Sequence, residues 1–185
     1  MSSGVERKLT TILAADAEGY SREMDADEVR ALGALRAARS VFSKFIERHH
    51  GRIANTAGDG LIAEFPSVVE AVQCAIEVQR ELGDLNRGPG SALRFRIGVH
   101  LGDVMVDGDD LLGEGVNLAA RLQAMAEPGG VLISQQVFDQ VHAKLSVGFE
   151  YAGEKRPRNF AEDVAVYRVD LDRKPHSGSH APRKP

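Results

Sequence analysis

The sequence predicts an α+β fold in which helices cover a mostly antiparallel sheet. Long segments of helical periodicity alternate with short apolar segments, in the coarse order β-α-β-β-α-β-β-α-β-α-β-β. Several of the short segments come in pairs joined by glycine-containing turns, as in β-hairpins. The length of 185 residues and the hydrophobic fraction of 43% suit one globular domain with a tail better than two domains.

The first predicted strand covers residues 9–15, an uncharged and mostly apolar run that is followed by Asp16. Such a run indicates a strand that is covered on both faces or lies at the centre of a sheet. Residues 17–21 are predicted to form a loop, and a helix is expected from about residue 25 to residue 50. Asp25 or Asp27 can cap the start of this helix, and Gly51 can end it.

The rest of the chain continues the same alternation. Residues 52–56 and 61–65 are predicted to form a hairpin, and residues 93–100 and 103–106 a second strand pair around Leu101 and Gly102. Helices are expected at 67–86, 113–126 and from Ser134 to about residue 145. The remaining predicted strands are 131–133, 148–153 and 164–169. We therefore predict a domain over residues 1–172 and a disordered tail over 173–185.

The charge balance limits the classes of partner. The tail holds four basic and no acidic residues, so residues 1–172 carry 19 basic against 27 acidic side chains. An acidic domain is a poor nucleic-acid binder, and any phosphate must be bound by metals, backbone N–H groups or a few arginines. The single cysteine, Cys74, excludes an internal disulfide and a cysteine-rich zinc site.

The hydropathy pattern predicts no membrane partner. No apolar run approaches the length of a membrane span, and residues 1–8 lack the apolar stretch of a signal peptide. We therefore expect a soluble cytoplasmic protein.

Two aspartates are candidate metal ligands because of their positions. Asp16 ends an apolar strand, and Asp59 lies at the tip of a hairpin turn between two glycines. A charge at the end of a buried strand is costly unless something offsets it. Two carboxylates that meet at one sheet edge would suit Mg²⁺, which prefers oxygen ligands and leaves room for substrate phosphates. Alternatively, Asp16 caps the next loop and Asp59 is an ordinary turn residue.

Phosphate contacts are predicted at two further places. The loop after the first strand could cradle phosphates with its backbone N–H groups. This loop comprises Ala17, Glu18, Gly19, Tyr20 and Ser21. Asn117 and Arg121 lie four residues apart on a largely apolar helix and so share one face, where an arginine would suit charge on a phosphoryl group. The alternative is an ordinary surface pair of Arg121 with Glu114 or Glu127.

Four segments, in this order, resemble the motifs of class III adenylate and guanylate cyclases. The segments are residues 12–21, 56–61, 96–104 and 113–122. The resemblance spans about residues 7–170, and its details are similar to short bacterial cyclases of the mycobacterial and rhizobial kind. It implies a ferredoxin-like α+β fold that works as a head-to-tail homodimer, with each of two active sites built from both chains.

The resemblance also implies a role for each candidate residue. Asp16 and Asp59 match the metal-binding aspartates, which hold two Mg²⁺ or Mn²⁺ ions against the triphosphate of ATP. Asn117 matches the asparagine that orients the ribose, and Arg121 the arginine that stabilises charge at the α-phosphate. In the homodimer these last two come from the partner chain.

Base choice in this family depends on two positions, which Asp110 and Asn55 occupy here. Asp110 matches the aspartate that accepts a hydrogen bond from the adenine amino group, although it is also one of three acidic residues in a loop that could simply be solvated. Asn55 stands where adenylate cyclases usually have lysine and guanylate cyclases glutamate. Asparagine can donate a hydrogen bond to adenine, but a neutral bond is weaker than a charge-assisted one.

The resemblance thus implies an adenylate cyclase that converts ATP to cyclic AMP. A guanylate or relaxed-specificity cyclase and a non-catalytic nucleotide-binding or dimerisation module remain alternatives. The family often has a phosphate-binding lysine before the last strand. Arg158 occupies that slot, Lys155 could replace it, and the segment 155–158 could also be a solvated basic turn.

Overall fold

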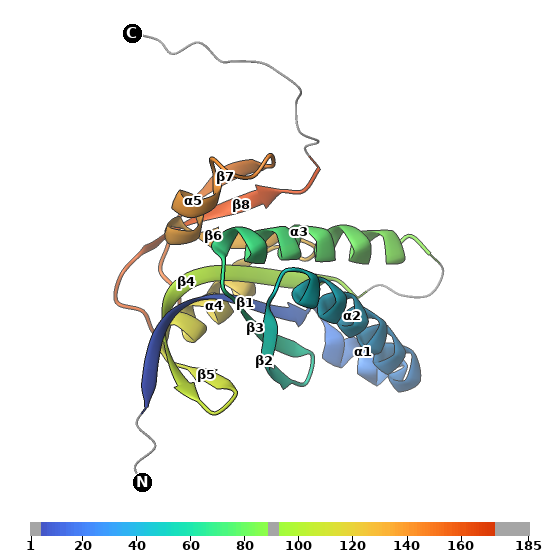
Figure 1. The fold of residues 1–185 in the computed structure, drawn as a ribbon. Helices are drawn as coiled ribbons and strands as arrows, with labels where there is room; N and C mark the ends of the chain where they lie inside the picture. Colours follow the sequence, from blue (N-terminus) through green and yellow to red (C-terminus); the bar gives the residue numbers. More distant parts are fainter. Residues whose placement is uncertain (1–4, 89–92, 173–185) are drawn as a thin grey trace.

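The computed structural model describes residues 5–88 and 93–172, so the predicted tail 173–185 lies outside the described residues. Helices and strands alternate largely as predicted (Figure 1). The elements are β1 (Glu6–Ala17), α1 (Tyr20–Ala26), α2 (Glu28–Arg48), β2 (Arg52–Ala57), β3 (Gly60–Phe65), α3 (Val68–Leu85), β4 (Phe95–Asp107), β5 (Asp110–Leu112), α4 (Glu114–Met125), β6 (Val131–Ser134), α5 (Gln135–Val141), β7 (Gly148–Lys155) and β8 (Val164–Asp170).

The strands form one sheet in the order β2-β3-β1-β4-β6-β8-β7, and β5 pairs with β4 beside this path. Among the described strands, β4 and β6 are the one parallel pair. The prediction of a mostly antiparallel sheet is therefore confirmed. The longest ladder joins β1 to β4, from Glu6 opposite Val106 to Ala17 opposite Phe95.

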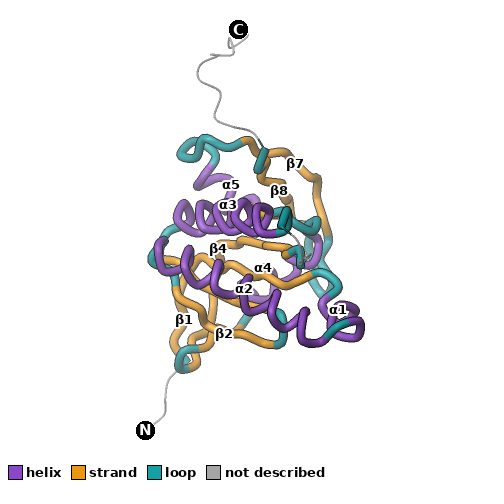
Figure 2. Tube along the Cα trace, turned by 90° about the vertical axis from the view of Figure 1, so that its right-hand side faces the viewer, coloured by secondary structure: helices purple, strands orange, loops and turns teal. Residues whose placement is uncertain are grey.

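Helices cover both faces of the sheet, as the apolar first strand predicts. Leu13 of β1 packs in a large core cluster with Phe42 of α2 and Val72 of α3. Ile12 points to the other face, where it packs with Ala119 of α4. Figures 1 and 2 show α2 and α3 side by side on one face and α4 on the other.

A glycine brings α4 close to the sheet. A Cβ at Gly98 of β4 would lie 2.4 Å from the backbone nitrogen of Gln123, so any larger residue would push the helix away. This close packing fixes α4, which carries Asn117 and Arg121, against the central strands.

The predicted loop and helix over residues 17–50 need correction. Tyr20 and Ser21 are helical, because α1 begins directly after Gly19 (φ 66°). The long helix is interrupted at Asp27, which has extended backbone angles and caps α2 by accepting a hydrogen bond from the Arg30 backbone at 3.1 Å. The prediction of Asp27 as a cap is confirmed. The helix ends at Arg48 rather than residue 50, and His50 takes a left-handed conformation (φ 62°).

The predicted turn at Leu101 and Gly102 is wrong. β4 runs without interruption through both residues, because β1 pairs with it along its whole length and Thr10 lies opposite Gly102. A Cβ at Gly102 would lie 2.7 Å from Nε2 of His100, so this glycine makes room for a side chain instead of turning the chain. The turn lies further on, at Gly108 (φ 60°), and leads into β5.

The last helix, α5, is capped by Ser134 as predicted but ends at Val141 rather than near residue 145. Among residues 5–88 and 93–172, no helix is both long and apolar enough to cross a bilayer.

Candidate active site

Asp16 and Asp59 come together although they are far apart in the sequence. β1 and β3 are antiparallel neighbours with Ala15 opposite Leu61, so the end of β1 meets the turn before β3. There the Oδ2 atom of Asp59 accepts a hydrogen bond from the backbone N–H of Ala17 at 2.9 Å. Both predicted metal ligands thus lie at one end of the central strands, as expected from their positions.

Arg96 is a residue of this site that the sequence interpretation missed. It lies directly opposite Asp16 in the β1–β4 ladder, and its Nε and Nη2 atoms bind the Asp16 carboxylate at 3.1 Å. Its Nη1 atom donates to the carbonyl of Ala124 in α4 at 3.2 Å. The sequence signal for this pairing was weak, because an arginine between the apolar residues Phe95 and Ile97 of a strand points to the opposite face from both.

The turn that carries Asp59 is held by α2. Arg39 of α2 donates a hydrogen bond from Nη2 to the carbonyl oxygen of Gly58. Gly58 has a φ of 58°, a conformation that favours glycine, and so permits the tight turn between β2 and β3. The position of the Asp59 carboxylate is therefore set by both a sheet contact and a helix contact.

Fewer residues of the predicted phosphate-binding loop 17–21 have available backbone N–H groups than expected. The backbone N–H of Ala17 donates to Asp59, and that of Glu18 donates to the carbonyl of Arg94 at 2.8 Å. Gly19, Tyr20 and Ser21 form the start of α1, where the first N–H groups have no acceptor within the helix. Only these last three residues of the predicted cradle offer backbone donors to a ligand.

Asn117, Arg121 and Arg158 surround one open cavity of about 720 Å³. The first two project from α4, and Arg158 comes from the segment between β7 and β8. Glu114 lines the same cavity, but within the described ranges neither it nor Glu127 forms an ion pair with Arg121. The prediction of a shared helix face therefore agrees with the structure better than the alternative of a surface ion pair.

The two candidates for the phosphate-binding cation are separated by the fold. Lys155 lines a different cavity, together with Glu150 and Arg168. Arg158 is thus the one of the two that lies with Asn117 and Arg121.

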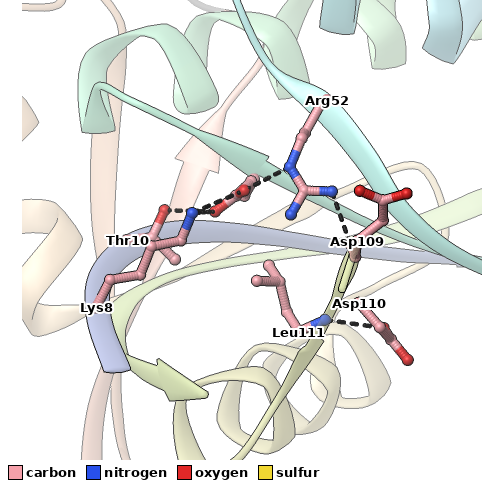
Figure 3. A network of polar contacts seen from close by, with 7 residues as sticks. Lys8, Thr10, Arg52, Asp109, Asp110 and Leu111 are labelled. Atoms are coloured by element: carbon pink, nitrogen blue, oxygen red, sulfur yellow. Dashed lines mark hydrogen bonds and ion pairs between the residues drawn. The ribbon is translucent and has the colours of Figure 1, made fainter. Parts of the chain in front are cut away.

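Asn55 and Asp110, the two candidates for base reading, also come together. The amide nitrogen of Asn55 lies 3.3 Å from Oδ1 and 3.4 Å from Oδ2 of Asp110. Asp110 Oδ1 also accepts a hydrogen bond from the backbone N–H of Leu111 at 2.9 Å, drawn in Figure 3. Both carboxylate oxygens therefore act as acceptors next to β2.

The buried carboxylate of Glu64 lies near this pair and binds side chains of the neighbouring strands. Glu64 of β3 is only 7% exposed and accepts hydrogen bonds from Lys8 and Thr10, each at 3.0 Å, and from Arg52 at 2.6 Å. Burial alone would raise the pKa of the Glu64 carboxyl, but the bonds from these three donors outweigh burial and hold the pKa below its ordinary value. Glu64 is therefore ionised at neutral pH.

Comparison with known proteins shows that the fold is that of a class III nucleotide cyclase domain. The sequence model for the adenylate and guanylate cyclase catalytic domain matches residues 6–159, and the chain belongs to this family.

A Rhizobium meliloti protein named "Putative adenylate cyclase 3" is 40% identical over 166 residues, which cover 88% of this chain. The chain spans 28% of that protein's length and 18% of the length of a second R. meliloti relative.

Solved structures share the fold. The crystal structure of an adenylate/guanylate cyclase/hydrolase from Silicibacter pomeroyi is 32% identical, with a TM-score of 0.83 over 90% of this chain and 98% of that one. The adenylyl cyclase CyaB from P. aeruginosa is 23% identical, with a TM-score of 0.80 over 92% of this chain and 98% of that one. The prediction of a class III cyclase fold is therefore confirmed.

Proposed function

We propose that the chain is the catalytic domain of an adenylate cyclase, which converts ATP to 3′,5′-cyclic AMP and pyrophosphate. The observation that carries this proposal is the cavity in which Asn117, Arg121 and Arg158 converge from α4 and the β7–β8 segment. Two guanidinium groups and an amide around one open cavity suit a ribose and a triphosphate.

The paired aspartates suit divalent ions as part of the same proposal. Asp16 and Asp59 offer carboxylate oxygens, and no group of three or more His, Cys, Asp and Glu side chains in the described ranges could hold a metal by itself. Mg²⁺ commonly binds through one or two carboxylates while substrate phosphates and waters complete its shell, so this donor set fits. We propose two Mg²⁺ or Mn²⁺ ions per active site. When bound, such ions neutralise the triphosphate and lower the pKa of the ribose 3′-hydroxyl.

The side chains then have distinct tasks in the reaction. The 3′-hydroxyl releases its proton to solvent and its oxygen forms a bond to the α-phosphorus, while the bond from that phosphorus to the leaving pyrophosphate breaks. Asn117 orients the ribose for this in-line attack. Arg121 stabilises the negative charge that develops at the α-phosphate, and Arg158 stabilises the departing pyrophosphate.

The location of these groups supports a homodimer with shared sites. Within the described ranges, neither Asp16 nor Asp59 lines the cavity of Asn117, Arg121 and Arg158. A head-to-tail dimer would bring the aspartates of one protomer to the cavity of its partner. An isolated protomer would then be inactive.

We also propose the cytoplasm as the site of action, because ATP is present there.

The adenine preference is proposed from the contact between Asn55 and Asp110. Both oxygens of Asp110 accept hydrogen bonds from Asn55, so the carboxylate is held as an acceptor. An acceptor suits the amino group of adenine and would repel the O6 oxygen of guanine. A guanylate or relaxed-specificity cyclase is the second candidate, because the neutral Asn55 replaces the lysine typical of adenylate cyclases.

Product analysis tests this proposal. Purified chain is incubated with ATP or GTP and Mn²⁺ over a range of protein concentrations, with Asp59→Ala as the control. We expect cyclic AMP as the main product and a specific activity that rises with protein concentration. Nucleotide binding without product would favour a non-catalytic module, and a preference for GTP would favour the second candidate.

A further inference from the structure

The two strands that carry Asn55 and Asp110 meet without a backbone ladder between them. In the described part of the chain, β2 has a ladder only with β3, and β5 only with β4. The contact between β2 and β5, called the seam below, is therefore held by side chains. The geometry of Asn55 and Asp110 depends on whatever holds the seam.

Arg52, at the start of β2, makes the shortest of the hydrogen bonds from β2 to β5 and the turn before it. Its Nη1 atom donates to the carbonyl oxygen of Asp109 at 2.7 Å, whereas the two contacts between Asn55 and Asp110 measure 3.3 and 3.4 Å. Both contacts are charge-assisted, one through the guanidinium donor and the other through the carboxylate acceptor, but the contact of Arg52 is the shorter and lies within the usual range for such bonds. Arg52 therefore holds the Asp109–Asp110 backbone more firmly than Asn55 does.

Glu64 fixes the guanidinium of Arg52. The Nε atom of Arg52 donates to Oε1 of Glu64 at 2.6 Å, and the two residues lie opposite each other in the β2–β3 ladder. Lys8 and Thr10 of β1 bind the same carboxylate. Figure 3 draws these contacts together with the contact from Arg52 to Asp109. Arg52 is thus anchored to β3 through Glu64, and the same carboxylate links it to Lys8 and Thr10 of β1.

The charge of Arg52 also matches the turn that it contacts. Asp107, Asp109 and Asp110 place three carboxylates around Gly108, and their mutual repulsion favours opening of the turn. A cation bonded to the backbone of Asp109 opposes this repulsion. Removal of that cation would let Asp110 move relative to Asn55.

We infer that Arg52 is a positioning residue for nucleotide selection: it holds the Asp109–Asp110 turn on β2 so that Asp110 and Asn55 keep the geometry in which they read the base. This inference rests on the proposed function, in which that pair contacts the base. Arg52 does not itself touch the nucleotide, and it acts through Asp110.

The test compares two substitutions that remove one cation each from Glu64. Arg52→Met breaks the seam contact, whereas Lys8→Met leaves the bond from Arg52 to Asp109 intact. The control is well matched, since the side chains of Arg52 and Lys8 are 39% and 40% exposed. The readout is the ratio of kcat/KM for ATP and GTP in the full chain. A second readout is the ratio of the dissociation constants of the α,β-methylene analogues of ATP and GTP. Equilibrium binding gives this ratio without turnover.

We expect Arg52→Met to move the ATP:GTP ratio toward one by about tenfold, the size of a lost charge-assisted hydrogen bond. Lys8→Met should lower the melting temperature to a similar extent but leave the ratio unchanged. In the background of Asp110→Ala, the Arg52 substitution should have no further effect on the ratio. An equal change of the ratio in both methionine variants, or a change of melting temperature alone in Arg52→Met, would overturn the inference.

The Asp110→Ala variant separates this inference from the proposed function. If Asp110→Ala shifts the nucleotide preference and Arg52→Met does not, only the role of Arg52 is wrong. If Asp110→Ala leaves the preference unchanged in both kinetics and binding, the pair does not read the base, and the inference about Arg52 falls with that proposal.

Discussion

Arg96 neutralises Asp16 across the β1–β4 ladder through contacts of 3.1 Å to both carboxylate oxygens. The two side chains are about equally exposed, at 27% and 28%. The proposed metal ligand is thus paired with a cation of its own chain. A metal ion bound at Asp16 would place a second positive charge next to this carboxylate.

Arg96→Met should destabilise the metal-free protein more than the metal-bound protein. The substitution leaves Asp16 without its counter-charge, at a cost of about 1 kcal/mol in the free energy of unfolding. Saturating Mn²⁺ with a non-cyclisable ATP analogue should reduce this deficit, because the ions supply positive charge. Thermal unfolding in EDTA and in Mn²⁺ measures both values, and equal deficits would contradict a metal site at Asp16.

Asp59→Asn should lower the rate of cyclic AMP formation without lowering the stability of the fold. Asparagine keeps an oxygen that can accept the hydrogen bond from Ala17, so we expect a melting temperature close to that of the wild type. Loss of the charge should lower the rate of cyclic AMP formation by about 100-fold or more. The rate and the melting temperature are measured on the same preparation. A variant of full activity would remove Asp59 from the metal site.

Mixing two inactive variants should restore activity if the sites are shared. Asp59→Asn and Arg121→Met damage different halves of the proposed site. In a statistical mixture half of the dimers carry one intact site out of two, so about a quarter of the wild-type rate should return. The rate is measured before and after joint refolding of equal amounts. Absence of any recovery, with heterodimers shown to be present, would place both residues in one protomer's site.

Asn55→Lys should strengthen the preference for ATP. A lysine at this position would place an ammonium group beside Asp110, where the amide nitrogen of Asn55 now lies 3.3 Å from the carboxylate. A charge-assisted donor toward adenine should raise the ATP:GTP ratio of kcat/KM by about fivefold. Competition between the two nucleotides in one assay gives this ratio directly. A lowered ratio would mean that position 55 does not face the base.

The stability of the fold should fall at alkaline pH because of His49. This buried side chain at the end of α2 contacts Glu70 through Nδ1 at 2.5 Å and Glu77 through Nε2, both on α3. Burial lowers the pKa of His49, but the hydrogen bonds to Glu77 and Glu70 outweigh burial and raise the pKa above its ordinary value of 6.5.

The sign of the pH dependence follows from that direction. Because the folded-state pKa is above the unfolded-state value, the stabilisation is fully present below about pH 6.5 and is lost as the pH rises through the folded-state pKa. Urea unfolding from about pH 6 to about pH 9 should show this decline in the wild type and not in His49→Gln. His142→Gln serves as a control, since His142 is exposed, contacts the backbone carbonyl and ring of Phe138, and has no carboxylate partner among the described residues. Parallel pH profiles for all three proteins would exclude His49 as the cause.

The sequence predicted the elements well where their causes are local. The cap at Asp27, the hairpin around Asp59 and the amphipathic helices follow from neighbouring residues, and all three are present. The turn at Gly102 was predicted wrongly, because its conformation is set by pairing with Thr10, which is remote in the sequence. A local pattern cannot reveal such a pairing.

The residues of the candidate site also fall into two groups, those that a local motif indicates and those that only the three-dimensional arrangement reveals. Position within a motif was enough to name Asp16, Asp59, Asn117 and Arg121 as candidates, and their roles stay predictions. The role of Arg96 depends on its register opposite Asp16, and the choice of Arg158 over Lys155 depends on which cavity each side chain lines. Both facts arise only when strands and loops are placed in three dimensions.

The absence of a backbone ladder between β2 and β5, in the part of the chain that is described, has a consequence for evolution and design. The seam can widen or shift through the exchange of a few side chains, while the ladders that hold Asp16 on β1 stay in place. Under the proposed function, the base preference could then change with few substitutions and without altering the ladders around the proposed metal ligand Asp16.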